Sequence, residues 1–219
     1  MEDIAAIILA AGRSERMGAF KPLLNFGAHT VIKACVEYLR GGGVETVVVV
    51  LGQGPRADDL HHHLKDSSVT FATNPDQTSQ MSDSIACGLQ AIPPSAKAVL
   101  ITPADHPAVP ADVVRVLIEE WRNGARLVMP TNAGRGGHPV LVDLQLIDEL
   151  RHLGTSGGLK GLFDSHRDEV RRVAVGSGYI ARDMDTWDDY RALHQEVFGV
   201  PPPEIPTQTV NNKGPDDAN

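Results

Sequence analysis

Several features that mark particular classes of protein are scarce or missing from this chain. Its 219 residues include two cysteines, Cys35 and Cys87, both inside segments of helical pattern, so we expect buried, reduced thiols rather than a disulfide or a metal pair. No apolar run approaches the roughly 18 residues of a transmembrane helix. Basic residues are outnumbered, and the net charge of −8 argues against nonspecific binding to nucleic acid or anionic membrane. That balance still permits a local cationic pocket for a small anion.

The first residues also lack the marks of an export signal. The segment MEDIAAIILAAG starts with acidic residues and contains no cleavage site, whereas a signal peptide needs a basic start and such a site. We therefore expect a cytoplasmic protein.

Apolar segments of strand length alternate with segments of helical period along most of the chain. We expect strands over residues 3–10, 44–52, 69–73, 96–105, 126–130, 137–142 and 170–175. We expect helices over residues 30–39, 56–64, 81–92, 111–124, 146–153, 158–163 and 186–198. This alternation predicts an α/β fold of βαβ units, with a mostly parallel central sheet and helices on both faces.

The length suits one α/β domain with a sizeable core, and we expect a single domain over residues 1–199. From Val200 onward the sequence VPPPEIPTQTVNNKGPDDAN is rich in proline and polar residues and has almost no core residues. Such a segment buries too little apolar surface to offset the entropy of ordering, so we expect a disordered C-terminal tail over residues 200–219.

In an open parallel sheet, ligands bind beyond the carboxyl ends of the strands, and the turn after the first strand reads LAAGRSERMGAFK. The small residues 10–12 let backbone N–H groups approach phosphate oxygens or a base edge. Arg13, Arg16 and Lys21 add three cations within nine residues, which in an acidic chain favours an anion site over a solvated basic patch. The turn fits neither common phosphate loop, and the second predicted strand lacks the acidic residue of a dinucleotide site, which disfavours a nicotinamide-binding domain.

Two carboxylates near strand ends are candidate metal ligands. Asp105 directly follows a predicted buried strand in TPADHP, and it could hold Mg²⁺ against phosphates or simply begin a turn. Because one carboxylate binds Mg²⁺ weakly, a second is needed, and ARDMDTWDDY supplies Asp183 and Asp185. We favour Asp185, although it could instead cap the last helix.

The helix predicted over residues 81–92 begins with two serines, Ser82 and Ser84. Ser82 could simply cap the helix. The alternative is that this helix start faces the first loop and holds the base or ribose of a nucleotide.

Several of these segments resemble the motifs of one enzyme family. LAAGRSERMGAFKPLL resembles the signature L-x-A-G-x-x-x-R-M-x-x-x-K of MobA-like nucleotidyltransferases, and TPADHP is similar to the metal-binding Asp loop of that superfamily. GRGGHPVLV and DMDTWDDY resemble the R-G-H-P-V and D-I-D-T-x-x-D segments of the molybdenum cofactor cytidylyltransferase branch, with one extra glycine in RGGHP. The resemblance covers roughly residues 4–198 and implies a Rossmann-like three-layer sandwich of the nucleotide-diphospho-sugar transferase type.

The resemblance implies transfer of CMP from CTP to the molybdopterin–molybdenum cofactor, with Mg²⁺ as cofactor and pyrophosphate as the leaving group. It assigns Arg16, Lys21 and Asp105 to catalysis, Asp105 and Asp185 to the metal, and Arg135 and His138 to the acceptor. The candidate nucleotide contacts are Leu9, Ala10, Ala11, Gly12, Arg13, Ser82 and Ser84, and similarity to D-S-V-x-x-G-L in other cytidylyltransferases puts Ser84 ahead of Ser82. Ala11 favours CTP, because guanylyl-transferring relatives usually carry glycine there.

The sequence leaves other functions open. Guanylyltransferases and sugar-phosphate nucleotidyltransferases of the superfamily share the first loop and Asp105. A carrier that hands the molybdenum cofactor to a hydroxylase without catalysis is an alternative of another class, and a transient complex with such a hydroxylase is also compatible with catalysis. An oxidoreductase is disfavoured by the missing ribose acid.

Overall fold

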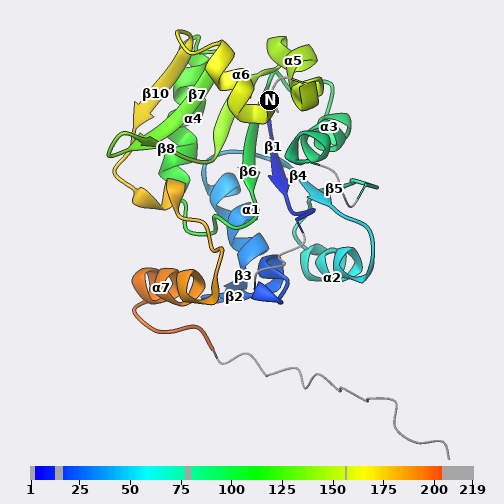
Figure 1. Ribbon diagram of the computed structural model, residues 1–219, viewed down its shortest axis with the longest axis vertical. Helices are drawn as coiled ribbons and strands as arrows, with labels where there is room; N and C mark the ends of the chain where they lie inside the picture. Colours follow the sequence, from blue (N-terminus) through cyan, green and yellow to red (C-terminus); the bar gives the residue numbers. More distant parts are fainter. Residues whose placement is uncertain (1–2, 13–16, 77–79, 156, 204–219) are drawn as a thin grey trace, which may run out of the picture.

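The computed structural model describes residues 3–12, 17–76, 80–155 and 157–203 and consists of a central sheet with helices packed on both faces (Figure 1). In spatial order the strands are β10 (Val170–Ala174), β7 (Leu127–Asn132), β9 (Val140–Asp143), β6 (Ala98–Pro103), β1 (Ile4–Leu9), β4 (Thr46–Leu51) and β5 (Thr70–Thr73). A short strand, β8 (Arg135–Gly136), pairs with β7.

Most neighbouring strands run parallel. β1 is parallel to β4 and β6, β4 is parallel to β5, and β10 is parallel to β7. β9 is antiparallel to both of its neighbours, β6 and β7. The prediction of a mostly parallel sheet is therefore confirmed, and the carboxyl ends of β1, β4 and β6 lie together at one edge, where ligands bind in such sheets.

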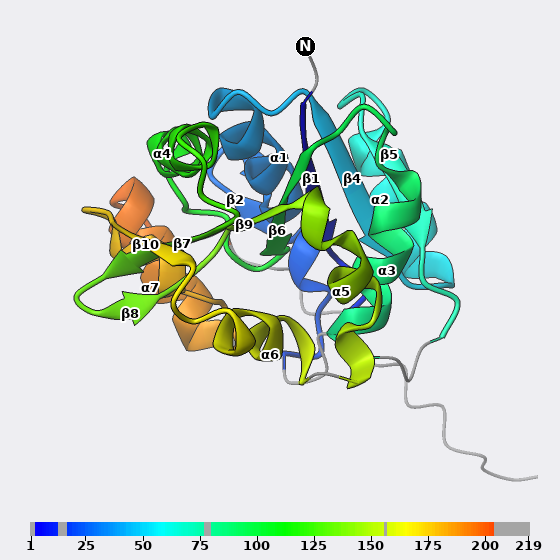
Figure 2. The ribbon, with the colours of Figure 1, turned by 90° about the horizontal axis from the view of Figure 1, so that it is seen from above.

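Two apolar cores separate the three layers, one on each face of the sheet (Figure 2). Side chains alternate between the faces along a strand, so Ile8 of β1 belongs to one core and Ile7 to the other. The first core is covered by α1 (Val31–Gly41), α2 (Pro55–Leu64) and α4 (Ala111–Arg122). The second is covered by α3 (Met81–Ala91), α5 (Ile147–Arg151) and α6 (Gly158–Ser165).

Each predicted strand and helix is present, with its ends shifted by a few residues at most. Within the described ranges, the elements that the sequence did not predict are β8, a two-stranded hairpin, and the 3₁₀ helices at Lys21–Leu23 (η2), Leu144–Leu146 (η3), Leu153–Thr155 (η4) and Gly178–Ala181 (η5). These are short elements whose side chains do not show a regular apolar period, so pattern analysis does not detect them.

A third apolar cluster lies apart from the two main cores. It joins the hairpin of β2 (Asn25–Phe26) and β3 (His29–Thr30) to the last helix, α7 (Trp187–Phe198), and the three lie together at one end of the molecule (Figure 1). The Tyr190 hydroxyl donates to the Asn25 carbonyl at 2.7 Å, and the Trp187 indole N–H donates to the Met17 carbonyl at 3.0 Å. Part of residues 17–30 therefore packs against the C-terminal helix, while Phe20 and Leu23 of the same segment pack against the first core.

The expectation for the two cysteines needs correction in detail. Cys35 and Cys87 are both free thiols, but only Cys35 is buried, because Cys87 lies on a half-exposed position of α3. Burial raises the pKa of both thiols. The Val200 carbonyl oxygen lies 2.8 Å from His194 Nδ1. The disordered tail expected over residues 200–219 stays a prediction, because residues 204–219 lie outside the described ranges. Among the described residues, no helix has the length and apolar character needed to span a membrane.

Candidate active site

Three of the predicted site residues meet beyond the carboxyl ends of the strands. The Lys21 ammonium lies 2.8 Å from Asp185 Oδ1 and 3.7 Å from Asp105 Oδ2. These residues come from η2, from the loop after β6, and from the segment before α7, so chain segments up to 164 positions apart meet at one cation. The fold thus brings together the lysine predicted to bind phosphate and both carboxylates predicted to bind metal.

The local structure explains why Asp185 points to Lys21. Thr186 caps α7 by accepting from Asp189 N at 3.1 Å, and Asp189 Oδ2 accepts from Thr186 N at 2.8 Å. This capping box satisfies the first turn of the helix, so the alternative that Asp185 is the cap is wrong. Met184 is fully buried in the third apolar cluster and fixes the backbone before Asp185.

Asp105 is placed by the ends of two neighbouring strands. β6 ends at Pro103, and Ala104 N donates to the Leu9 carbonyl at the end of β1 at 3.1 Å. The Asp105 carboxylate then faces Lys21 and, through Oδ1 at 3.7 Å, His106 Nε2. Among the described residues, its recorded ion pairs are with Lys21 and His106.

A buried pair of histidines backs the carboxylates. His106 and His138 lie with ring centroids 5.4 Å apart, and the Nδ1 atom of each is buried without a hydrogen-bond partner among the described residues. Burial lowers the pKa of His106, and the nearby Asp105 carboxylate acts in the opposite direction. Burial is also the main cause that lowers the pKa of His138 to about 4, and the charge of His106 is the second cause. Burial therefore favours the neutral form of both rings. Sequence reasoning missed His106, whose only signal was its place directly after Asp105.

The second glycine of RGGHP has a structural reason. A Cβ on Gly137 would lie 2.2 Å from the Ile180 carbonyl oxygen, and His138 N donates to that same carbonyl at 2.7 Å. Only glycine allows β8 and its loop to approach η5 this closely. The contact ties His138 to the segment that leads into Asp183 and Asp185. Arg135 is exposed on β8, and within the described residues no hydrogen bond or ion pair connects it to Lys21 or the two carboxylates.

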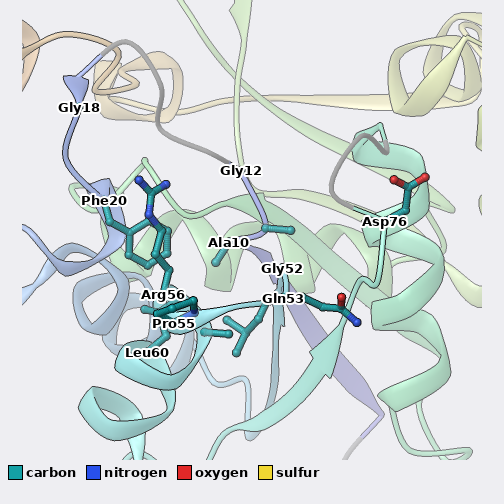
Figure 3. A pocket seen from close by; sticks show the side chains of 13 residues that line it. Ala10, Gly12, Gly18, Phe20, Gly52, Gln53, Pro55, Arg56, Leu60 and Asp76 are labelled. Atoms are coloured by element: carbon teal, nitrogen blue, oxygen red, sulfur yellow. The ribbon is translucent and has the colours of Figure 1, made fainter. Parts of the chain in front are cut away.

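A cavity of about 660 Å³ opens between the ends of β1 and β4 (Figure 3). Ala10, Ala11 and Gly12 line one wall, and Ala10 is held there because its N–H donates to the Val50 carbonyl at 2.9 Å. Residues that the sequence did not suggest complete the lining, among them Gly18, Phe20, Gly52, Gln53, Pro55, Arg56 and Asp76. The Arg56 guanidinium lies 5.4 Å from the centre of the Phe20 ring on one side, and Gln53 and Asp76 lie on the other.

The remaining nucleotide candidates fall into three groups. Leu9 packs against the apolar core under α3 and does not line the cavity. Ser82 is not the cap of α3, because Gln80 and Asp83 form its capping box, and Ser84 is buried and accepts from Asn74 Nδ2 at 2.9 Å. Neither serine is part of the cavity lining. Arg13 and Arg16 lie outside the described residues.

The sequence and fold both match known proteins. The MobA-like NTP transferase domain matches residues 6–170. The chain is 26% identical over 192 residues to the molybdenum cofactor cytidylyltransferase of Escherichia coli (strain K12), which covers 87% of this chain and 95% of that protein. It is 35% identical over 133 residues to a 2-C-methyl-D-erythritol 4-phosphate cytidylyltransferase of Streptomyces avermitilis, over 58% of this chain and 52% of that protein.

Among solved structures, Rv0371c from Mycobacterium tuberculosis H37Rv aligns with a TM-score of 0.77 at 28% identity, over 88% of this chain and 98% of that one. Another structure of that protein is a complex with manganese. Together with the α/β fold, the match over most of the length leads to one conclusion. The chain belongs to the MobA-like NTP transferase family and is a nucleotidyltransferase of that family.

Proposed function

We propose that the protein transfers CMP from CTP to the molybdopterin–molybdenum cofactor and releases pyrophosphate. The observation that carries this proposal is the cluster of Lys21, Asp105 and Asp185, because it joins a cation for phosphate to two carboxylates for metal. Lys21 directly follows Phe20, which lines the cavity. The attacking phosphate of the acceptor is already ionised, so the reaction needs positioning and charge stabilisation rather than a general base.

The nucleotide would lie in the cavity between β1 and β4. The small residues 10–12 allow close approach of the backbone, and Ala11 favours cytosine over guanine by the family pattern. Asp76 and Gln53 on the rim can pair with a base edge, since a carboxylate accepts from the exocyclic amine of cytosine. Lys21 would neutralise charge on the triphosphate, and Arg13 and Arg16 would donate hydrogen bonds to its oxygens.

A divalent metal fits the carboxylate pair. Asp105 and Asp185 both lie near one ammonium group, and this shared position for a cation supports their assignment to the metal. The described residues contain no group of three or more His, Cys, Asp or Glu side chains that could hold an ion, so phosphate and water oxygens must complete the shell, as Mg²⁺ prefers. When bound, Mg²⁺ would stabilise the charge that develops at the α-phosphate.

The acceptor would approach from the side of β8. Arg135 is exposed there and can reach a phosphate, while the neutral His138 lies behind it against His106. The same geometry suits other phosphorylated acceptors, and the match to the Streptomyces avermitilis enzyme makes a sugar-alcohol phosphate the second candidate.

Turnover assays with the purified protein, Mg²⁺ and each of the four nucleoside triphosphates test the proposal. Pyrophosphate release should require the molybdenum-loaded pterin and should be much faster with CTP than with GTP or ATP. A clear GTP preference would contradict the base assignment. Turnover with 2-C-methyl-D-erythritol 4-phosphate but not with the pterin would replace the acceptor, and cofactor transfer to a hydroxylase without any nucleotide would indicate a carrier.

A further inference from the structure

The Lys21 ammonium lies at the two carboxylates that we assign to the metal. Its Nζ is 2.8 Å from Asp185 and 3.7 Å from Asp105, and its side chain is only 11% exposed. The carboxylates themselves are 26% and 39% exposed. The positive charge is therefore held in place, whereas both acids remain within reach of an ion from solvent.

A divalent ion that approaches the pair must do so against this fixed charge. At a separation of a few ångströms, and with the lysine largely buried, solvent screens the repulsion only in part. Among the described residues, the two carboxylates do not belong to a larger cluster of His, Cys, Asp or Glu side chains that could hold an ion. A free metal ion thus meets two acids that are already neutralised in part and a cation beside them.

A metal ion that is already bound to a triphosphate experiences different electrostatics at the same site. The phosphates bring their own oxygen ligands, and their negative charge gives the Lys21 ammonium a new partner. The Lys21 ammonium then neutralises the two carboxylates less. The negative phosphates, which lie between the ammonium and the metal, offset the repulsion between these two cations. We infer that Lys21 makes this site select the metal–triphosphate complex over the free metal ion. The inference rests on the proposed metal role of Asp105 and Asp185 and adds to it an order of binding.

Direct measurement of Mn²⁺ binding without nucleotide tests this role independently of catalysis. Electron paramagnetic resonance reports the free Mn²⁺ concentration in titrations of the wild type and of Lys21→Met, which keeps the aliphatic stem and removes the charge. Lys21→Met should bind Mn²⁺ about tenfold more tightly or better. Lys21→Arg keeps the charge and should bind like the wild type. Lys65→Met, at an exposed position after α2, is the matched control for loss of one positive charge and should also bind like the wild type.

The outcomes separate this inference from the proposed metal site. If Lys21→Met binds Mn²⁺ no more tightly than the wild type, Lys21 does not select against the free ion. Asp105→Asn or Asp185→Asn, each added to Lys21→Met, should remove the gain in Mn²⁺ affinity. A gain that survives both changes would show that the ion binds elsewhere and that the metal assignment is wrong. Lys21→Gln provides a second charge-free variant, and circular dichroism checks that each variant is folded. Mn²⁺ should raise the Tm of the charge-free variants more than that of the wild type, because tighter binding to the folded state stabilises it more.

Discussion

Replacement of Gly137 by alanine should disturb the site from a position outside it. The added Cβ would lie 2.2 Å from the Ile180 carbonyl oxygen and 2.5 Å from the carbonyl carbon, and these backbone atoms cannot rotate away as a side chain can. Either β8 or η5 must shift, and the 2.7 Å hydrogen bond from His138 N to Ile180 O lies at that contact. Overpacking costs about 1–3 kcal/mol and a lost hydrogen bond about 1 kcal/mol, so the free energy of unfolding should fall by about 2–4 kcal/mol.

Thermal unfolding followed by circular dichroism measures this effect, and a loss of that size corresponds to a Tm lower by about 5–15 °C in a chain of this length. Gly176→Ala is the matched control, because Gly176 is exposed and, apart from its two chain neighbours, no heavy atom of the described residues lies within 4 Å of the Cβ it would gain. It should change the free energy of unfolding by no more than about 0.5 kcal/mol. Turnover of CTP by Gly137→Ala should fall even at temperatures where the variant is folded, because His138 and the segment before Asp185 are displaced. A Tm equal to that of the control would refute the argument from close approach.

Three other predictions follow from single contacts. Asp105→Ala should keep the circular dichroism spectrum of the wild type and lose pyrophosphate release by about a hundredfold or more, and near-normal turnover would contradict its assignment. Hydrogen bonds from Glu149 and Glu169 raise the pKa of His166, so the stability gained from this pairing is complete below the ordinary histidine pKa and is lost as the pH rises through the folded pKa. The urea midpoints of wild type and His166→Gln should therefore differ more at pH 6 than at pH 9, and equal differences would contradict the pairing. A Cβ on Gly88 would lie 2.8 Å from a methyl group of β1, so urea titration of Gly88→Ala should show a loss of about 1–3 kcal/mol unless α3 can move away.

The sheet and its helices could be predicted because the core strands of this fold have an unambiguous pattern. VETVVVV is almost entirely β-branched and forms β4, whose residues Val47 to Val50 are buried on both faces. The hairpin at residues 25–30 escaped prediction because two-residue strands have no measurable period. It forms because Phe26 packs in the third apolar cluster with residues of α7, a contact between segments far apart in sequence.

The residue that caps a helix can in some cases be predicted from the spacing of polar residues. Thr186 followed three residues later by Asp189 is a variant of the capping-box pattern, and it assigns the cap of α7 to Thr186 rather than Asp185. Gln80 and Asp83 do the same for α3 and remove Ser82 from the cap. The alternative for Asp185 could thus have been decided from residue spacing, whereas the cap of α3 could not, because glutamine is not a usual N-cap residue.

The cavity residues could not be found in this way, because they depend on the order of strands in space. Gln53 and Arg56 matter only because β4 lies directly beside β1, so that the turn after β4 faces residues 10–12. A sequence of alternating strands and helices allows several strand orders. If β5 or β6 took the place of β4 beside β1, other loops would lie next to residues 10–12.

The meeting of Lys21 with Asp185 depends on the third apolar cluster as well as on the first core. Lys21 lies between Met17 and Leu24, both buried in that cluster, and Asp185 follows Met184, which is buried there too. Asp105, by contrast, is fixed by the ends of β6 and β1. Phe20 and Leu23, which lie close to Lys21 in the chain, pack against the first core, and that core also contains Ala104, the neighbour of Asp105. Lys21 is therefore held by both clusters, whereas Asp185 depends on the packing of Met184 in the third cluster. A change in how α7 packs should accordingly displace Asp185 more than it displaces Lys21 or Asp105.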